Sequence, residues 1–152
     1  MIYLLLLILG ITAGLRAATP LAAVSIGAYL GWIDLSGTWA AFVGHPITAA
    51  ILGIVAIVEL IGDQRANGPS RKVPMQFGAR IVAGALAGMV LGIPSTAWIA
   101  GLILGAIGAV LGTLGGYEVR RMLAKALGRD LPAALIEDAV ALIGAFLMVY
   151  LA

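Results

Sequence analysis

The stretch IVAGALAGMVLGIPSTAWIAGLILGAIGAVLGTLGGY, residues 81–117, decides the fold class of this chain. Its 37 residues contain no Lys, Arg, Asp or Glu. As a single helix it would be about 55 Å long, whereas the hydrocarbon core of a bilayer is about 30 Å thick. The sequence therefore predicts two membrane-spanning helices, Ile81–Ile93 and Trp98–Tyr117, with the chain turning back at residues 92–96.

The composition of the whole chain agrees with a membrane protein. Hydrophobic residues make up 62% and charged residues 11% of the 152 residues, and the mean hydropathy is +1.13. Soluble domains have about 45–50% and about 25% of these residues. We expect a single transmembrane domain over residues 1–152. The absence of cysteine excludes disulfides and thiolate metal sites, and the net charge of +2 is too small to indicate a nucleic-acid partner.

Three more stretches are apolar and long enough to cross a bilayer: Leu15–Ile33, Ala40–Gly62 and Leu131–Ala152. Residues 1–14 are too short to cross alone. They either extend the first helix through a break at Gly14 and Pro20, or they form a re-entrant segment. No Lys or Arg precedes this apolar run, so we expect it to be retained rather than cleaved as a signal peptide. The sequence predicts an all-α membrane protein with about five transmembrane helices, or four plus a re-entrant N-terminal segment.

Basic residues and tryptophans indicate how the chain is oriented. Eight of the nine basic residues form two clusters, which are Arg65, Arg71, Lys72 and Arg80, and then Arg120, Arg121, Lys125 and Arg129. The positive-inside rule places loops 63–80 and 118–130 in the cytoplasm and the C-terminus outside. Trp32, Trp39 and Trp98 then all fall at the outer interface, as an aromatic belt requires. Residues 63–74 are expected to be a cytoplasmic linker between two halves.

Glycine is abundant and periodic, with 21 residues in the chain. The repeat follows helical spacing, which keeps the small residues on one face of each hairpin arm. Such stripes let two backbones approach closely in lipid. We expect these glycines to pack the two arms of the hairpin together: Gly84, Gly88, Gly92, Gly101, Gly105, Gly108, Gly112 and Gly115. Gly27 and Gly31 repeat the pattern in the first span, so an oligomer interface is an alternative use.

Six charged residues are expected in the cytoplasmic third of the spans. A charge at the centre of a span costs about 2.5–3.5 kcal/mol on insertion scales, so such residues usually pair or face a cavity. We expect Arg16 and Arg80 to be partners of the acids. One interpretation is that the charges are interfacial and solvated. The functional alternative is a polar vestibule or proton-linked site open to the cytoplasm, made by Arg16, Glu59, Arg80, Glu118, Glu137 and Asp138.

Short matches between the two halves suggest an internal repeat. Gly14-Leu15-Arg16 opens the first long span and Gly78-Ala79-Arg80 opens the third, and about 40 residues later each half reaches an acid, Glu59 or Glu118. Both halves would run in the same direction, which is a parallel repeat. Internal repeats are common in transporters, whose sites lie at the repeat interface.

No motif names a reaction. His45 stands beside Pro46 without cysteine or a nearby carboxylate, so it is not a metal site; a structural role and a proton-sensing role both remain open. The serines have no His or Asp partner at a workable depth, and no glycine-rich loop carries a P-loop lysine. We therefore expect neither an enzyme nor a bound cofactor.

Four stretches together resemble a family of small bacterial inner-membrane proteins known only as a domain of unknown function. They are GLRAATPL at 14–21, VELIGDQ at 58–64, the Gly/Ala helix led by Arg80, and LPAALIEDAVAL at 131–142. This chain departs from the family pattern at Ile81, where proline is usual, and at Gln64, where lysine is usual. The resemblance implies a multispanning fold in a bacterial inner membrane and implies no activity.

Two functional hypotheses follow. The first is a transporter or channel for an ion, small solute or lipid, built on the intramembrane charges and the broken first helix; with so few spans, its pathway would need a homodimer. The alternative is an accessory subunit of a larger membrane complex, favoured by short loops and glycine faces. A membrane-embedded enzyme is the weakest hypothesis. The lipid bilayer and a second copy or a partner membrane subunit are the expected partners.

Overall fold

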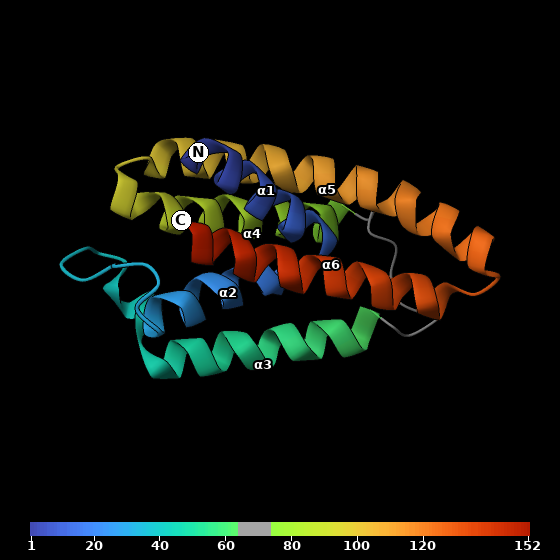
Figure 1. The fold of residues 1–152 in the computed structure, drawn as a ribbon, viewed down its shortest axis with the longest axis horizontal. Helices are drawn as coiled ribbons and strands as arrows, with labels where there is room; N and C mark the ends of the chain where they lie inside the picture. Colours follow the sequence, from blue (N-terminus) through green and yellow to red (C-terminus); the bar gives the residue numbers. More distant parts are fainter. Residues whose placement is uncertain (64–73) are drawn as a thin grey trace.

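The computed structural model describes residues 1–63 and 74–152 (Figure 1). The described residues form six α-helices and two 3-10 turns and contain no strand. Their bounds are α1 Ile2–Leu15, α2 Ala18–Tyr29, η1 Ala41–Gly44, α3 Pro46–Asp63, α4 Pro74–Gly92, η2 Ile93–Ser95, α5 Trp98–Leu127 and α6 Asp130–Leu151. Most of the predicted linker, with the basic residues Arg65, Arg71 and Lys72, lies outside the described residues.

Three of these helices are long and apolar enough to span a membrane: Pro74–Ser95, Trp98–Leu127 and Asp130–Leu151. The prediction of a helical membrane protein is confirmed in this respect. The helical hairpin predicted around residues 92–96 is also present, because α4 and α5 run antiparallel on either side of η2. The turn closes with Thr96 in the left-handed region at a φ of 55°, a conformation that is uncommon outside glycine.

The first two helices form a hairpin of their own. Along α1, Thr12 lies against Gly144 and Arg16 pairs with Asp138 of α6. Along α2 the direction reverses, since Gly27 lies against Val149. The chain therefore reaches a tip at residues 16–17 and returns to the end of the molecule where it began, as Figure 1 shows.

This hairpin replaces the crossing helix that was expected over Leu15–Ile33. Arg16 is extended, with φ −144° and ψ 113°, and α2 has only 12 residues, or about 18 Å. Pro20 lies in the first turn of α2, where a missing N–H is tolerated. Of the two sequence alternatives for residues 1–14, one continuous helix with a break is wrong, because the chain turns back at the break.

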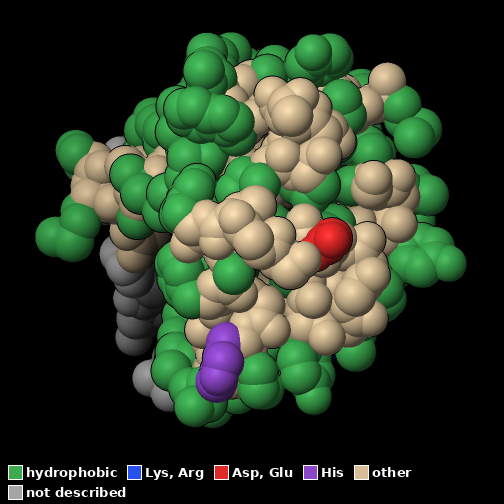
Figure 2. All heavy atoms as spheres, turned by 90° about the vertical axis from the view of Figure 1, so that its left-hand side faces the viewer, with side chains coloured by type: hydrophobic (Ala, Val, Ile, Leu, Met, Phe, Trp, Pro, Cys, Tyr) green, Lys and Arg blue, Asp and Glu red, His purple; other side chains and the backbone are tan. Residues whose placement is uncertain are grey.

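The molecule has two unlike ends. Trp32, Trp39 and Trp98 lie at the end that also carries both chain termini and the α4–α5 turn, which we name the tryptophan end. The opposite end carries the α5–α6 turn at Gly128 and is named the basic end. Figure 2 looks onto the tryptophan end and shows green and tan surface with a histidine and an acidic side chain, and no Lys or Arg comes into view.

Glycines bring three helix backbones into contact. A Cβ placed on Gly84 would lie 2.6 Å from the carbonyl oxygen of Gly105, and one on Gly92 would lie 2.5 Å from that of Ala97. The sequence assigned the whole α5 stripe to the contact with α4. In the structure the stripe divides: Gly101 and Gly105 face α4, whereas Gly108 and Gly112 face α1. The hairpin of α1 and α2 explains this, because α1 lies parallel to α5.

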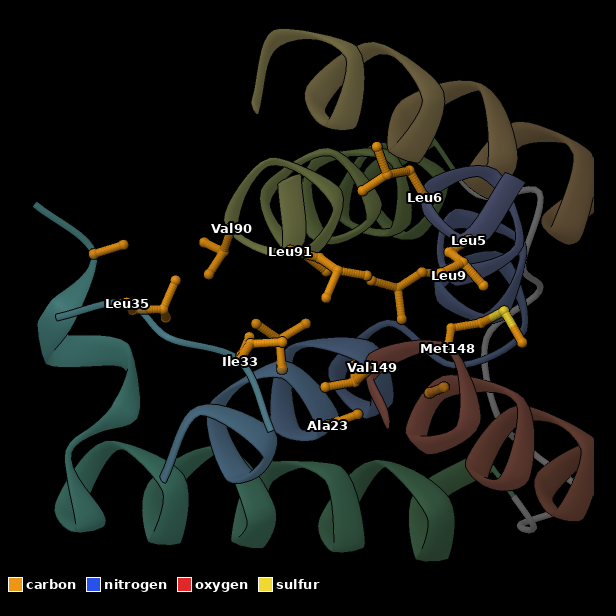
Figure 3. Close-up of a cluster of buried hydrophobic side chains, with 14 of the residues drawn as sticks. Leu5, Leu6, Leu9, Ala23, Ile33, Leu35, Val90, Leu91, Met148 and Val149 are labelled. Carbon is orange, nitrogen blue, oxygen red and sulfur yellow. The ribbon is translucent and has the colours of Figure 1, made fainter. Parts of the chain in front are cut away.

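The main apolar core fills the space between the arms of the first hairpin. Figure 3 shows leucines of α1 meeting residues of α2, α4 and α6 and of the loop after α2. Leu6, Leu9 and Leu91 are among the largest side chains that are almost fully buried. This core lies in the half of the molecule nearer the tryptophan end.

The helices group into two units. Helices α1, α4 and α5 pack closely on one another, while α3 packs on α2 and η1. Helix α6 contacts both groups. The tip of the first hairpin therefore lies where the two units meet.

Candidate functional site

Arg16 is the centre of a buried charged cluster at the hairpin tip. Its side chain is 0% exposed. The Nη2 atom forms an ion pair with Oδ1 of Asp138, Nη1 lies 3.8 Å from Oε1 of Glu137, and Nη1 donates a hydrogen bond to the Leu15 carbonyl at 3.0 Å. A buried arginine needs such partners, since an uncompensated charge in the interior is strongly unfavourable.

The C-terminal end of α1 is capped by side chains of two other helices. Arg80 of α4 donates from Nη1 to the carbonyl oxygens of Gly14 and Leu15, both at 2.7 Å. The Thr113 hydroxyl of α5 lies 3.3 Å from the same Gly14 oxygen. The last carbonyls of a helix have no partner within the helix and carry partial negative charge, so a guanidinium satisfies and stabilises them.

The N-terminal end of α2 is capped in the complementary way. The Glu59 carboxylate of α3 accepts hydrogen bonds from the backbone N–H groups of Ala17 and Ala18, each at 2.7 Å and one to each oxygen. These N–H groups would otherwise be orphans at the positive end of the helix dipole. Each half-helix is therefore completed by an opposite charge from a distant part of the chain.

Glu137 links this cluster to the basic end. Its Oε2 atom lies 3.5 Å from Nη1 of Arg120, and Arg120 also makes a two-pronged pair with Asp130 at 3.1 and 2.7 Å. The Arg120 side chain is 17% exposed and the Asp130 side chain 61% exposed, so this chain of charges runs from the buried tip toward solvent. We define the charged cluster as Arg16, Glu59, Arg80, Arg120, Glu137 and Asp138.

A cavity of about 210 Å³ adjoins the cluster at the N-terminus of α2. Its lining brings together the three elements that meet there: Ala17, Glu59, Gln76, Ala79 and Arg80. It is large enough for a few water molecules or a small ion. The acid and the base that cap the facing ends of α1 and α2 therefore both line this cavity.

The cluster lies well inside the hydrophobic part of the molecule. Counting from the tryptophan end along each helix at 1.5 Å per residue, Arg80 is about 18 Å deep, Glu59 about 20 Å and Thr113 about 22 Å. These distances agree with one another, so the three side chains lie at one level of the bundle. Charges inside transmembrane helices usually mark pathways or relays.

The structure brings together five of the six charged residues that the sequence singled out. Arg16 meets Glu137 and Asp138, as expected. Glu118 lies apart: its side chain is 49% exposed and pairs with Arg121 one turn along, at 3.0 Å.

Sequence reasoning missed Arg120 and Thr113. Arg120 was counted only as a signal of orientation, and nothing in the sequence distinguishes it from its exposed neighbour Arg121. Thr113 was missed as a single polar residue in an apolar helix. The available signal was its position in the glycine-rich part of the helix, near Gly108 and Gly112. In the structure the Thr113 hydroxyl also donates a hydrogen bond to the Ala109 carbonyl, at 2.8 Å.

Two of the remaining polar candidates form hydrogen bonds with backbone groups. His45 Nδ1 accepts a hydrogen bond from the N–H of Ile47 at 3.2 Å and so caps the start of α3. The Ser25 hydroxyl donates to the Val43 carbonyl at 2.5 Å. Over residues 1–63 and 74–152, no group of three His, Cys, Asp or Glu side chains is arranged to hold a metal ion.

Comparison with known proteins places the chain by sequence and leaves its activity open. No curated protein and no solved structure matches it. The family model described as "Domain of unknown function (DUF4126)" matches residues 3–152, nearly the whole chain. This match confirms the family resemblance seen in the four motifs, each of which supplies at least one residue of the charged cluster. The chain therefore belongs to the DUF4126 family of domains of unknown function.

Proposed function

We propose that the protein is a small membrane transporter or channel in which an ion or small charged solute passes the charged cluster at the hairpin tip. The observation that carries the proposal is that the end of α1 and the start of α2 meet at the hairpin tip, where Arg80 caps the first and Glu59 the second, and that both residues line one cavity. Discontinuous helices whose ends meet near the middle of the membrane are the usual binding elements of secondary transporters.

In this proposal the orientation follows the positive-inside rule. The basic end faces the cytoplasm, both chain termini face outward, and the membrane is a bacterial inner membrane. Helices α3 to α6 cross the bilayer, and α1 with α2 forms a re-entrant hairpin that enters from outside. The cavity beside Glu59 then opens toward the cytoplasm.

The two helix groups suggest how access could alternate. Helices α1, α4 and α5 are held by close backbone contacts at glycines, so they move as one body. Helices α2 and α3 form the second body, and the contacts of Glu59 with α2 and of Arg80 with α1 keep the two half-helices aligned. A solute or proton that neutralises Glu59 weakens its hydrogen bonds with the Ala17 and Ala18 N–H groups. Helix α2 is then free to shift.

The test is flux through purified protein in liposomes. The vesicles contain a pH-sensitive dye and potassium salt, and valinomycin sets a membrane potential, so proton movement and its dependence on chloride, sodium or acetate are read directly. We expect flux above protein-free vesicles and its loss in Glu59→Gln. Arg121→Gln is the matched control, since it removes an exposed charge outside the cluster. Absence of flux in every salt, or equal flux in Glu59→Gln, contradicts the proposal.

The accessory-subunit alternative has its own observation in α3. This helix exposes a broad apolar face that includes Ile47, Ile51, Ile54 and Val58, and Gly53 has open space around it. A partner helix could cover that face. Native mass spectrometry of the protein extracted gently from its own membrane separates the readings: stoichiometric retention in a larger assembly favours the subunit, and a homodimer favours transport.

A further inference from the structure

The tryptophan end carries a second cavity, at the opposite end of α2 from the charged cluster. Its volume is about 790 Å³, within the range of about 300–1,000 Å³ that is usual for sites of organic ligands. The walls come from the loop after α2, from η1 and from the first residues of α3, and Ala28 of α2 lines it too. Ala28 lies about 16 Å along α2 from Ala17, so this cavity is separate from the one beside Glu59.

Local backbone geometry shapes the wall that comes from the loop. Helix α2 ends in a Schellman turn, in which Gly31 has a φ of 79° and the Trp32 N–H donates to the Gly27 carbonyl at 2.8 Å. The following residues alternate, with Ile33 and Leu35 buried and the residue after each of them exposed. The loop is therefore anchored by its apolar side chains and presents its polar side chains outward.

Asp34 presents a fixed carboxylate with no basic partner. It lines the cavity, and its Oδ1 atom accepts hydrogen bonds from the hydroxyl and the N–H of Ser36. Its Oδ2 atom accepts none from residues 1–63 and 74–152, and within these ranges Asp34 forms no ion pair. The bonds from the Ser36 hydroxyl and N–H also hold the pKa of this carboxyl below its usual value, so it is charged at neutral pH.

Two ring side chains complete the lining, and no positive side chain joins them. Phe42 lines the cavity and is 61% exposed, so its ring can contact a ligand. His45 also lines it, and its Nδ1 atom is occupied by the N–H of Ile47. Among the described lining residues there is no Lys or Arg, and none comes into view on this face in Figure 2. The cavity therefore combines one uncompensated negative charge with an aromatic ring.

We propose that this cavity binds an organic cation, in the form of a primary ammonium group attached to an apolar body. The ammonium group lies at Oδ2 of Asp34, and the apolar body covers Phe42 and the wall formed by Ile33 and Leu35. A carboxylate and the face of an aromatic ring both attract a cation, whereas an anion would be repelled by Asp34. A soluble amine and the headgroup of phosphatidylethanolamine share this chemistry. The site does not rest on transport through the charged cluster.

The experiment is an NMR titration of the protein in dodecyl maltoside micelles, which contain no ammonium group. The probe is phenethylamine, while phenethyl alcohol and hydrocinnamate place a neutral and a negative group on a similar apolar body. We expect the amine to shift the Asp34 carboxyl carbon and the His45 ring signals until the site saturates, with about fivefold lower affinity for the alcohol and no saturable shift with the acid. Equal affinity for the amine and the alcohol, or no saturable shift with the amine, overturns the proposal.

Two variants and a matched control test the two contacts. Asp34→Asn keeps the size of the side chain and should lower the affinity for phenethylamine about fivefold, read at His45, because an exposed ion pair contributes up to about that factor. Phe42→Leu should lower it about threefold through loss of the ring. Glu118→Gln removes an exposed acid far from the cavity, at the basic end, and should leave the affinity unchanged. Wild-type affinity in Asp34→Asn overturns the proposal.

Phosphatidylethanolamine added to the same micelles distinguishes the two sources of the ammonium group. If the lipid headgroup is the natural ligand, this lipid shifts the signals of Asp34 and His45, displaces phenethylamine and does neither in Asp34→Asn. Phosphatidylglycerol, which has no ammonium group, should produce no shift. If phosphatidylethanolamine leaves both signals unchanged while phenethylamine still binds, the ligand is a soluble amine. Equal shifts with the two lipids would show that the cavity does not select an ammonium group, which overturns the proposal.

Discussion

The apolar core near the tryptophan end and the charged cluster at the hairpin tip lie in the same pair of helices and are held together by different physics. In the core, Leu6 and Leu9 of α1 pack against α4 and α6 with no polar partner. Two turns further along α1, Arg16 is equally buried among carboxylates. The core tolerates any side chain of suitable shape, whereas the cluster requires particular charges at particular atoms.

The cluster therefore requires particular residues, whereas the core requires only apolar side chains of suitable volume. Dispersion contacts in the core are individually weak and numerous, so losing one group costs only its share. In the cluster each charge compensates another, and removal of one partner leaves a buried charge exposed to low dielectric. We expect substitutions to divide accordingly.

The largest effect is expected for Arg16→Met. Loss of the guanidinium leaves Glu137 and Asp138 buried without their partner, at a cost of about 3–5 kcal/mol. The measurement is the free energy of unfolding in mixed micelles as sodium dodecyl sulfate is added. Arg121→Met, which breaks only the exposed pair with Glu118, should cost less than about 1 kcal/mol. The triple variant Arg16→Met, Glu137→Gln, Asp138→Asn should recover much of the loss, and equal damage in the triple variant would contradict this account of the cluster.

Leu9→Ala probes the apolar core in the same assay. Leu9 is fully buried, and the cavity left by truncation should cost about 2–5 kcal/mol. The loss at Arg16 is recovered by neutralising the opposing acids, whereas this loss should be reduced by a second-site change of matched volume, such as a larger residue at Ala145 in the same core. A Leu9→Ala variant as stable as wild type would show that this core is loosely packed.

Gly105→Ala tests the close backbone contact between α4 and α5. The added Cβ would overlap the carbonyl oxygen of Gly84, so α4 and α5 must separate, and we expect a loss of about 1–3 kcal/mol. Gly53→Ala adds the same atom where there is open space and should stabilise by up to about 1 kcal/mol through helix propensity. Thermal unfolding of both variants reads the sign, and destabilisation by Gly53→Ala would show that α3 is covered.

The smallest effect is expected in the loop at the tryptophan end. Hydrogen bonds from the Ser36 hydroxyl and from its N–H, at 2.5 and 2.9 Å, hold the pKa of the Asp34 carboxyl below its usual value. A lowered pKa contributes stability above the ordinary Asp pKa and loses it as pH falls through the folded value. Ser36→Ala should therefore raise the pKa of Asp34, measured by carbon-detected NMR titration. Because the group is exposed, thermal stability should change little, and a large change would mean that this loop supports the fold.

Much of the fold follows from local patterns in the chain. The uncharged run at residues 81–117 specifies two helices because a single one would be far too long for a bilayer. The break at Gly14 and Pro20 was visible because glycine and proline both interrupt helices. The reversal at that break was not specified, since an extended residue at Arg16 is compatible with a chain that continues or turns back.

The candidate site was predictable in its members and not in its contacts. Arg16, Glu137 and Asp138 stand out as charges inside apolar runs, so the free-energy cost of inserting them in a membrane is enough to identify them as candidates. No local signal in the sequence indicates that Glu59 accepts hydrogen bonds from backbone N–H groups 42 and 41 residues earlier. No local signal indicates that Arg80 donates hydrogen bonds to carbonyls 66 and 65 residues earlier. Arg120 and Arg121 are adjacent and chemically identical, and only their positions around α5 decide that one joins the cluster.

By itself, the sequence determined that this is a helical membrane protein, where its longest hairpin turns, and which charges are costly. These conclusions rest on hydropathy, helix rise and insertion cost, which add up residue by residue along the chain. Long-range contacts were needed to show that the first two helices fold back at Arg16, that the glycines of α5 contact both α4 and α1, and that Arg80 caps the end of α1 while Glu59 caps the start of α2. The reason is that orphan backbone groups and buried charges must find partners in space, and those partners lie far away in the chain.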